Sequence, residues 1–232
     1  MTTTLEQDAD CVCALIREKL GKSGRIMVGI AGPPASGKST LAEAVVRKLN
    51  EEAEADSVSG FPPTQAVLLP MDGYHLDNSL LEARGQLARK GAPETFDSNG
   101  FCRAVRQLAE AQDESYHPRF DRKMDLAIAS SIAVSPDVPV VVVEGNYLLL
   151  NSTPWSSLQD IFALTIFVCP SFDALQDRLE QRWIDHGLDG EAAIFRTTSN
   201  DLPNARAVIE QSRSADLHLD QNYPEMSARY AN

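Results

Sequence analysis

The 232-residue sequence has no long hydrophobic run. Its two most apolar stretches, residues 138–143 and 161–169, are far shorter than the roughly 20 residues that a membrane-spanning helix requires. The N-terminal segment also lacks the cationic start and the apolar core of a secretory signal peptide. We therefore expect a cytoplasmic protein that does not insert into a membrane.

Basic residues are few, and this excludes two classes of partner. The chain has 21 Lys and Arg residues against 33 Asp and Glu residues, which gives a formal net charge of −12. Nucleic acids and anionic membranes are bound by basic surfaces, so we expect neither as a partner. We expect a small molecule with a hydroxyl group as the partner, and the chain could also form a homodimer.

Cysteines are also few and are not arranged as a metal or redox motif. The four residues Cys11, Cys13, Cys102 and Cys169 form neither a CxxC pair nor a zinc-binding pattern. The pair at positions 11 and 13 could act in redox chemistry, but buried or surface thiols are the simpler interpretation. This pattern suits a reducing compartment.

Short apolar segments alternate with amphipathic ones along the whole chain. The strand-like segments are residues 26–31, 66–71, 138–144, 161–168 and 215–219. The helical segments are residues 5–20, 41–49, 101–111, 173–183 and 192–213, while residues 53–63 and 80–100 read as irregular. Strands that are apolar on both faces and alternate with helices indicate an α/β fold, a doubly wound parallel sheet with helices on both faces. We expect one domain over residues 1–232, with an N-terminal helix within residues 1–24.

A glycine-rich segment, GPPASGKST, follows the first strand at residues 32–40. It matches the P-loop pattern GxxxxGK[ST], in which backbone amides surround phosphate groups at the start of a helix. The residues expected to bind ATP are Gly32, Ala35, Ser36, Gly37, Lys38, Ser39 and Thr40. Lys38 should reach the β- and γ-phosphates, and the Ser39 hydroxyl should bind Mg²⁺. The structural alternative is a glycine turn that caps a helix beside an exposed lysine.

Two further strands end in carboxylates. Asp72 closes the second strand, where it could accept a proton from an attacking hydroxyl, bind metal, or simply form a turn before Gly73. Glu144 follows four consecutive valines, as in a Walker B strand. We expect Glu144 to bind Mg²⁺ directly or through water, because a buried unpaired acid is costly. In a parallel sheet both residues would lie beyond the carboxyl edge, where ligands bind.

Seven motifs, taken in order, resemble a known family. They are GPPASGKST, MDGYHLDN, RG, RKGAPETFD, YHPRFDR, VEGNYLLL and NDLPNA, between residues 25 and 219. The chain resembles the pantothenate kinase, uridine kinase and phosphoribulokinase family of P-loop kinases, and is most similar to its fructose transport system kinase-like, or nucleoside kinase-like, branch. The resemblance implies a kinase fold with a small lid and transfer of the γ-phosphoryl group of ATP to a small metabolite.

The resemblance also implies roles for residues at matching positions. Asp72 matches the family's catalytic carboxylate, and Arg178 and Arg182 lie where the family has a lid, at about residues 178–200. An acceptor-side insertion is expected at about residues 80–125. The residues expected on the substrate side are Tyr74, His75, Arg84, Phe96, His117, Arg122 and Tyr147.

Several of these assignments have structural alternatives. Arg178 and Arg182 could form surface ion pairs on one helix face, and Arg122 could pair with another acid. His75 and His117 could be ordinary polar residues, and Tyr147 could be a packing residue. The NDLPNA residues Asn200, Asp201 and Asn204 could cap a helix, whereas the resemblance suggests that they border the nucleotide base.

Three functions are compatible with these motifs. The first is a kinase acting on a hydroxyl of a sugar such as fructose, of a nucleoside or of a pantothenate-like metabolite. The second is a nucleoside monophosphate kinase, whose acceptor phosphate would need arginines such as Arg84, Arg89, Arg103, Arg106 and Arg119. The third is a regulatory P-loop NTPase acting through a protein partner. Asp72 favours the hydroxyl acceptor, and the absence of an NKxD guanine motif favours ATP.

Overall fold

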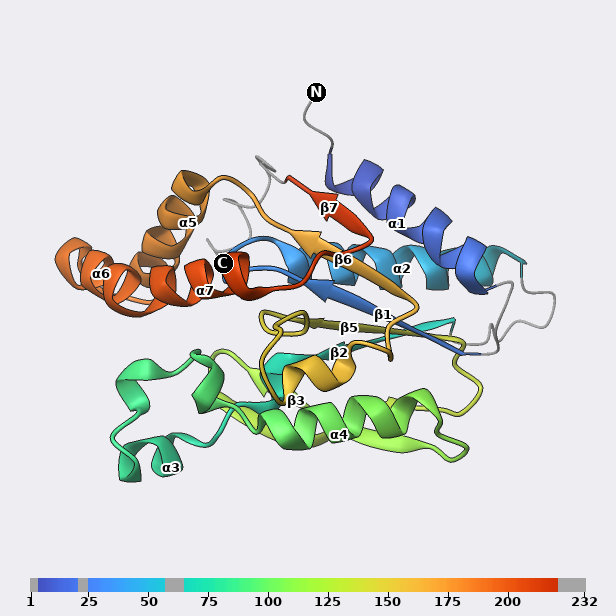
Figure 1. Ribbon diagram of the computed structural model, residues 1–232, viewed down its shortest axis with the longest axis horizontal. Helices are drawn as coiled ribbons and strands as arrows, with labels where there is room; N and C mark the ends of the chain where they lie inside the picture. The colour runs from blue at the N-terminus through green and yellow to red at the C-terminus, as the bar shows by residue number, and fades with distance from the viewer. Residues whose placement is uncertain (1–3, 21–24, 57–64, 221–232) are drawn as a thin grey trace.

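The computed structural model describes residues 4–20, 25–56 and 65–220 (Figure 1). The strands are β1 (Ile26–Ala31), β2 (Ala66–Pro70), β3 (Ser115–Asp121), β4 (Leu126–Val134), β5 (Val140–Gly145), β6 (Leu164–Val168) and β7 (Leu217–Leu219). The helices are α1 (Leu5–Leu20), α2 (Lys38–Asp56), α3 (Asn78–Ala83), α4 (Ser98–Ala109), α5 (Phe172–Asp185), α6 (Gly190–Arg196) and α7 (Leu202–Gln211). A short 3-10 helix, η1 (Met71–Tyr74), follows β2, and a π-helical turn, η5 (Thr197–Asp201), joins α6 to α7.

Five strands form a parallel sheet in the order β2-β5-β1-β6-β7. The P-loop strand β1 lies at the centre, and β5 separates it from β2. This arrangement confirms the α/β fold predicted from the alternating apolar segments. In the described part of the chain, no helix is both long enough and apolar enough to cross a membrane.

The sheet divides the core into two layers because alternate side chains of each strand point to opposite faces. Ile26, Val28 and Ile30 of β1 pack with α1 and α2, whereas Met27 and Ala31 pack with the layer that contains α4. Figure 1 shows this arrangement, with α1 above the sheet and α4 below it. Every residue of β1 and β5 is buried, so apolar side chains are required on both faces.

The structure corrects two expectations about local structure and confirms a third. Residues 80–100 are not irregular throughout: α3 ends there and α4 begins there, with two short 3-10 helices between them. Residues 192–213 are largely helical, as predicted, and they form α6, η5 and α7 in succession. Of the expected connection over residues 53–63, α2 extends to Asp56, and the remainder lies outside the described residues.

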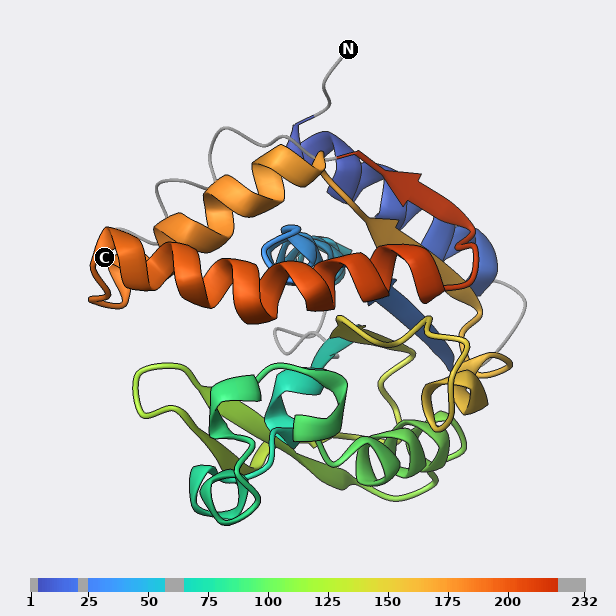
Figure 2. The ribbon, with the colours of Figure 1, turned by 60° about the vertical axis from the view of Figure 1, so that its left-hand side comes forward.

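The two-stranded sheet β3–β4 was not predicted from the periodicity alone. Its antiparallel strands pair Ser115 with Val134 and Asp121 with Leu126, with an irregularity between His117 and Arg119. Many positions on both strands remain exposed, so the clear apolar alternation of a half-buried strand is missing. Figure 2 shows this hairpin beside α3, across from the helices α5 to α7.

Two glycines allow η1 to approach the sheet and the hairpin closely. A Cβ atom on Gly73 would lie 2.3 Å from the carbonyl oxygen of Pro118 in β3. A Cβ atom on Gly145, the last residue of β5, would lie 2.5 Å from the Cβ atom of Met71. Asp72 lies between these two contacts in η1, so both glycines help to fix its place at the carboxyl edge of the sheet.

We expect Gly73→Ala to damage both stability and function, because the added methyl group meets backbone rather than a movable side chain. Overpacking of this kind costs about 1–3 kcal/mol, and displacement of Asp72 by about 1 Å should lower activity by up to ~100-fold. Thermal denaturation and nucleotide turnover would measure the two effects. Gly190→Ala is the matched control, since nothing lies within 4 Å of the point that a Cβ atom there would occupy. Unchanged melting temperature and turnover in Gly73→Ala would contradict the argument.

Candidate active site

The P-loop connects β1 to α2 and has the backbone shape of a phosphate-binding turn. Ala35 and Gly37 have positive φ angles of 62° and 96°. Gly32 approaches the neighbouring strand so closely that a Cβ atom there would lie 2.2 Å from the carbonyl oxygen of Val168. The helix then begins at Lys38, so its unpaired N-terminal amides point into the loop. Backbone amides and the helix start together make a binding site for anions.

Lys38, Ser39 and Glu144 meet at the base of this loop. The Ser39 hydroxyl donates a hydrogen bond to Glu144 Oε2 at 3.1 Å, and Glu144 is only 3% exposed. Burial raises the pKa of Glu144, and the nearby charge of Lys38 opposes this only in part. Burial lowers the pKa of Lys38, against the attraction of Glu144 and Asp72. The lysine and the two acids are therefore close enough to influence one another's charge.

Asp72 lies at the same edge of the sheet and forms an ion pair with Arg122. Arg122 comes directly after β3, and its NH2 group lies 2.8 Å from Asp72 Oδ2. Burial raises the pKa of Asp72, but the positive charges around it, led by Arg122, outweigh burial and hold the pKa below its ordinary value. Asp72 is therefore ionised at neutral pH. An ionised carboxylate at this position can accept a hydrogen bond from a hydroxyl group.

His75 forms an aromatic stack next to Asp72. Its ring lies between those of Phe96 and Phe120, with centroid distances of 4.0 Å and 4.7 Å. Its Nδ1 atom lies 2.8 Å from the backbone carbonyl oxygen of Asp72. Because a carbonyl can only accept, Nδ1 carries the proton and Nε2 is the acceptor of the neutral ring. Burial lowers the pKa of His75 and favours this neutral form.

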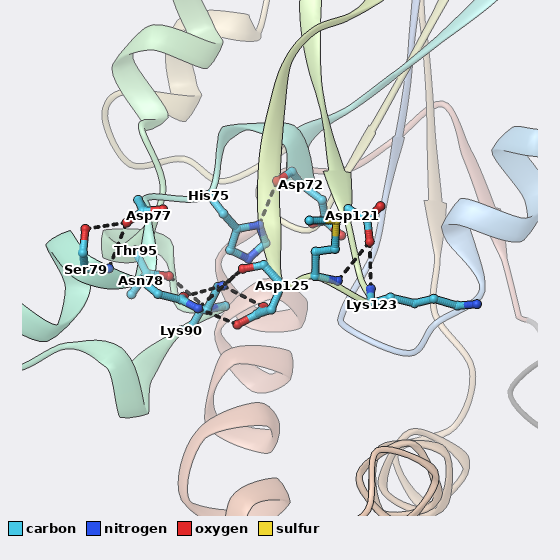
Figure 3. A network of polar contacts seen from close by, with 12 residues as sticks. Asp72, His75, Asp77, Asn78, Ser79, Lys90, Thr95, Asp121, Lys123 and Asp125 are labelled. Carbon is cyan, nitrogen blue, oxygen red and sulfur yellow. Dashed lines mark hydrogen bonds and ion pairs between the residues drawn. The ribbon is translucent and has the colours of Figure 1, made fainter.

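The stacked rings of Phe96, His75 and Phe120 form a wall beside Asp72, which we call the acceptor wall. Lys90 holds the outer part of this wall in place (Figure 3). Lys90 Nζ donates to Asn78 Oδ1 at 2.6 Å and to Asp125 Oδ1 at 2.7 Å, and it lies 5.0 Å from the centre of the Phe120 ring. These contacts connect α3 to the β3–β4 turn. The Lys90 side chain is only 12% exposed, whereas the side chain of its partner Asp125 is 54% exposed, so this ion pair lies at the protein surface.

The two predicted lid arginines extend from α5 toward the P-loop. Arg178 NH1 lies 3.4 Å from the carbonyl oxygen of Ala35 and 3.5 Å from that of Ser36. Arg182 NH2 lies 3.4 Å from Asp201 Oδ2, and its charge acts on both Lys38 and Asp72. The acid that pairs with Arg182 thus belongs to η5 and not to the same face of α5.

Four of the predicted substrate residues lie elsewhere. Tyr74 points away from the stack, with its hydroxyl 3.3 Å from His117 Nδ1, and both residues line a cavity of about 220 Å³ against α4. Arg84 is exposed at the end of α3. Tyr147 is fully buried and donates a hydrogen bond to the Gly91 carbonyl oxygen at 2.5 Å, so it is a packing residue.

Sequence reasoning missed Lys90, Asn78 and Asp125 as parts of the wall. Lys90 belongs to the RKGAPETFD motif, but nothing in that motif indicates its partner on the distant hairpin. The turn residue Asp125 has a φ angle of 52°, a conformation that aspartate tolerates better than most residues. The helix-cap alternative for Asp201 is wrong, because its side chain makes no capping hydrogen bond.

Magnesium would find suitable ligands here. Among the described residues, no group of three or more His, Cys, Asp or Glu side chains is arranged to hold a metal ion. Kinases bind Mg²⁺ with only one or two protein oxygens, and water and phosphate complete the octahedron. The Ser39 hydroxyl and the Glu144 carboxylate, 3.1 Å apart, are such a donor set.

Comparison with known proteins agrees with this geometry. The model of the phosphoribulokinase / uridine kinase family matches residues 27–225. A candidate uridine kinase of Schizosaccharomyces pombe, C227.14, is 32% identical over 211 residues, which cover 88% of this chain and 86% of the relative. The uncharacterized protein YggC of Escherichia coli is 33% identical over 196 residues, which cover 84% of this chain and 78% of the relative.

A solved structure gives the same result. A candidate fructose transport system kinase from Silicibacter sp. TM1040 superposes with a TM-score of 0.80 at 42% identity. The match covers 93% of this chain and 98% of that one. These comparisons confirm the family expected from the motifs. The chain belongs to the phosphoribulokinase / uridine kinase family of P-loop kinases, and it carries out ATP-dependent phosphoryl transfer to a small metabolite.

Proposed function

We propose that the acceptor is a hydroxyl group of a small polar metabolite and that Asp72 takes the proton from it. The observation that carries the proposal is the place of Asp72: an ionised carboxylate at the carboxyl edge of the sheet, within electrostatic reach of the P-loop lysine. A carboxylate so placed can orient the attacking oxygen and accept its proton. A phosphate acceptor is already ionised and needs no such base.

The ion pair with Arg122 leaves room for this role. Arg122 engages Oδ2 of Asp72, while Oδ1 makes no hydrogen bond to any other described residue. Oδ1 can therefore accept a hydrogen bond from an acceptor hydroxyl group. The side chain of Arg122 is 61% exposed, so it can also turn toward a bound acceptor.

Magnesium would be held by Ser39 and Glu144, with Asp72 as a third nearby oxygen donor. When bound with ATP, the ion supplies positive charge that offsets the charge of the phosphate groups. Lys38 would bind the β- and γ-phosphates through the P-loop, as the motif predicts. Arg178 and Arg182 would add positive charge near the transferred phosphoryl group and help to exclude water.

The wall beside Asp72 supports an acceptor with both an apolar face and polar groups. The aromatic stack of Phe96, His75 and Phe120 offers ring faces, and His75 Nε2 offers a hydrogen-bond acceptor. A sugar such as fructose, a nucleoside or a pantothenate-like molecule has the required mixture of faces and hydroxyl groups. The structure of the wall fits this class better than a second anionic phosphate.

A nucleoside monophosphate kinase would need arginines around the acceptor, and two of the five candidates already have other partners. Arg89 pairs with Glu94, and Arg106 donates to the carbonyl oxygen of Ser157 on the far side of α4. The remaining three candidates, Arg84, Arg103 and Arg119, are exposed. The five candidate arginines therefore support this alternative less well than Asp72 supports a hydroxyl acceptor.

Replacing Asp72 tests the proposed base. We expect Asp72→Asn to lower kcat by about 100- to 10,000-fold, because the amide cannot accept the proton. The dissociation constant for a non-hydrolysable ATP analogue should change little, and both quantities can be measured by a coupled ADP assay and by calorimetry. Asp121→Asn is the matched control, since Asp121 only accepts from the backbone amides of its turn. A kcat within threefold of the wild type would contradict a role as base.

A panel of acceptors tests the substrate class. We expect ADP release above the acceptor-free background with at least one sugar, nucleoside or pantothenate-like compound, and none with nucleoside monophosphates. A thermal-shift screen with an ATP analogue present should find the same compound, because a ligand that binds only the folded state raises its stability. Turnover with monophosphates alone would contradict the proposal. Nucleotide-dependent protein complexes without small-molecule turnover would favour the regulatory alternative.

A further inference from the structure

Trp183 on α5 lies at the centre of an arrangement that the proposed chemistry does not explain. The guanidinium groups of Arg182 and Arg196 lie 5.2 Å and 5.1 Å from the centre of its ring. Its indole Nε1 donates a hydrogen bond of 2.5 Å to Asp201 Oδ2. The same carboxylate oxygen lies 3.4 Å from Arg182 NH2. One acid therefore holds both the tryptophan and the arginine next to it.

Asp201 is an unusual residue for this position. Its side chain is only 7% exposed, and a buried carboxylate is costly unless it is paired and hydrogen-bonded. The shortest of its contacts comes from a neutral indole, while Arg182 and Asn200 Nδ2 both lie at 3.4 Å. The indole thus fixes the carboxylate, and the carboxylate attracts Arg182 without fully engaging it. Arg182 keeps donors available for another anion.

Asp201 is positioned by a π-helical turn, a backbone conformation that is rare in proteins. Asp201 is the last residue of the π-helical turn η5, directly before α7. A π-helical turn holds one more residue than an α-helical turn, so it rotates the following side chains by about 100° relative to the preceding helix. Such turns occur often at functional sites. In this chain the turn directs an acid toward α5.

Arg182 connects this arrangement to the reaction centre. Burial has the largest influence on the pKa of Lys38 and of Asp72, and the charge of Arg182 also lowers both. Its guanidinium group is therefore close enough to act on charges at the P-loop and at the proposed base. The neighbouring arginine Arg196 donates instead to the backbone carbonyl oxygens of Ala88 and Lys90, so it ties the tryptophan to the acceptor wall.

We propose that Asp201 is a positioning residue. With the help of Trp183 it holds Arg182 so that the guanidinium group of Arg182 meets the transferring phosphoryl group. The inference rests on the proposed function, in which Arg182 stabilises charge in the transition state. The hydrogen bond from Trp183 fixes the position of the Asp201 carboxylate. The carboxylate in turn limits the rotation of the Arg182 side chain. Without it Arg182 spends less time at the phosphoryl group, and the loss appears in kcat more than in binding of the ground state.

A double-mutant cycle tests whether Asp201 acts through Arg182. Asp201→Asn keeps an oxygen for the indole N–H but removes the charge that attracts Arg182. We expect it to lower kcat by about 10- to 100-fold, less than the loss of a direct donor, and to leave the KM values for ATP and acceptor within about threefold. In an Arg182→Met background the same substitution should change kcat by less than about twofold.

Two further variants guard against a structural explanation. Glu210→Gln makes the same acid-to-amide change on the exposed side of α7, where Glu210 is 60% exposed, and should leave kcat unchanged. Trp183→Phe keeps a ring between the two guanidinium groups but removes the N–H donor, so it should lower kcat in the same direction. If Asp201→Asn fails to fold, Trp183→Phe carries the cycle with Arg182→Met.

The outcomes separate the inference from the function on which it rests. An equal loss of kcat in the wild-type and Arg182→Met backgrounds, or a wild-type kcat in Asp201→Asn, would overturn the positioning role and leave the kinase function intact. Absence of turnover by the wild-type protein with every acceptor would instead count against the proposed function.

Discussion

The site depends on three charged groups, Lys38, Glu144 and Asp72, that offset one another. Apolar surroundings alone could not stabilise any one of these charges. Lys38 is 8% exposed, and burial by itself would drive it toward its neutral form. Glu144 and Asp72 supply the opposite charge, and the parallel register brings their strands together by pairing Pro70 of β2 with Glu144 of β5. The P-loop, the Walker B strand and the proposed base thus form one electrostatic unit. A change in one of the three charges alters the cost of burying the other two.

The proposed acceptor wall is held together through Lys90. The Lys90 side chain binds Asn78 and Asp125, while its backbone carbonyl oxygen accepts hydrogen bonds from Arg196 and Asn200. A single residue therefore connects α3, the β3–β4 turn, α6 and η5. A displacement of α6 or η5 would therefore also affect the aromatic stack, because Lys90 also lies over the Phe120 ring.

The fold and the nucleotide half of the site could be predicted because their signals are local. A buried strand followed by GPPASGKST specifies both the turn and its ligand, and valines 140–143 before Glu144 specify a central strand that ends in an acid. The acceptor half could not be predicted in the same way. His75 and Tyr74 are adjacent in the sequence, yet η1 turns one toward Asp72 and Phe96 and the other toward His117. Only the packing of distant segments decides which of two such neighbours faces the site.

The arginines illustrate the same limit and suggest a reason for the acidic composition. Arg122 and Arg182 each lie beside a carboxylate that is far away in the sequence, Asp72 and Asp201. Such pairing offsets the repulsion among Lys38 and the two arginines while no triphosphate is bound. The acids must be placed so that the arginines can still move to an arriving anion. A chain with a net charge of −12 can therefore assemble a locally cationic site, provided that its acids leave some of the cations incompletely engaged. The long 3.4 Å contact between Arg182 and Asp201 meets this condition.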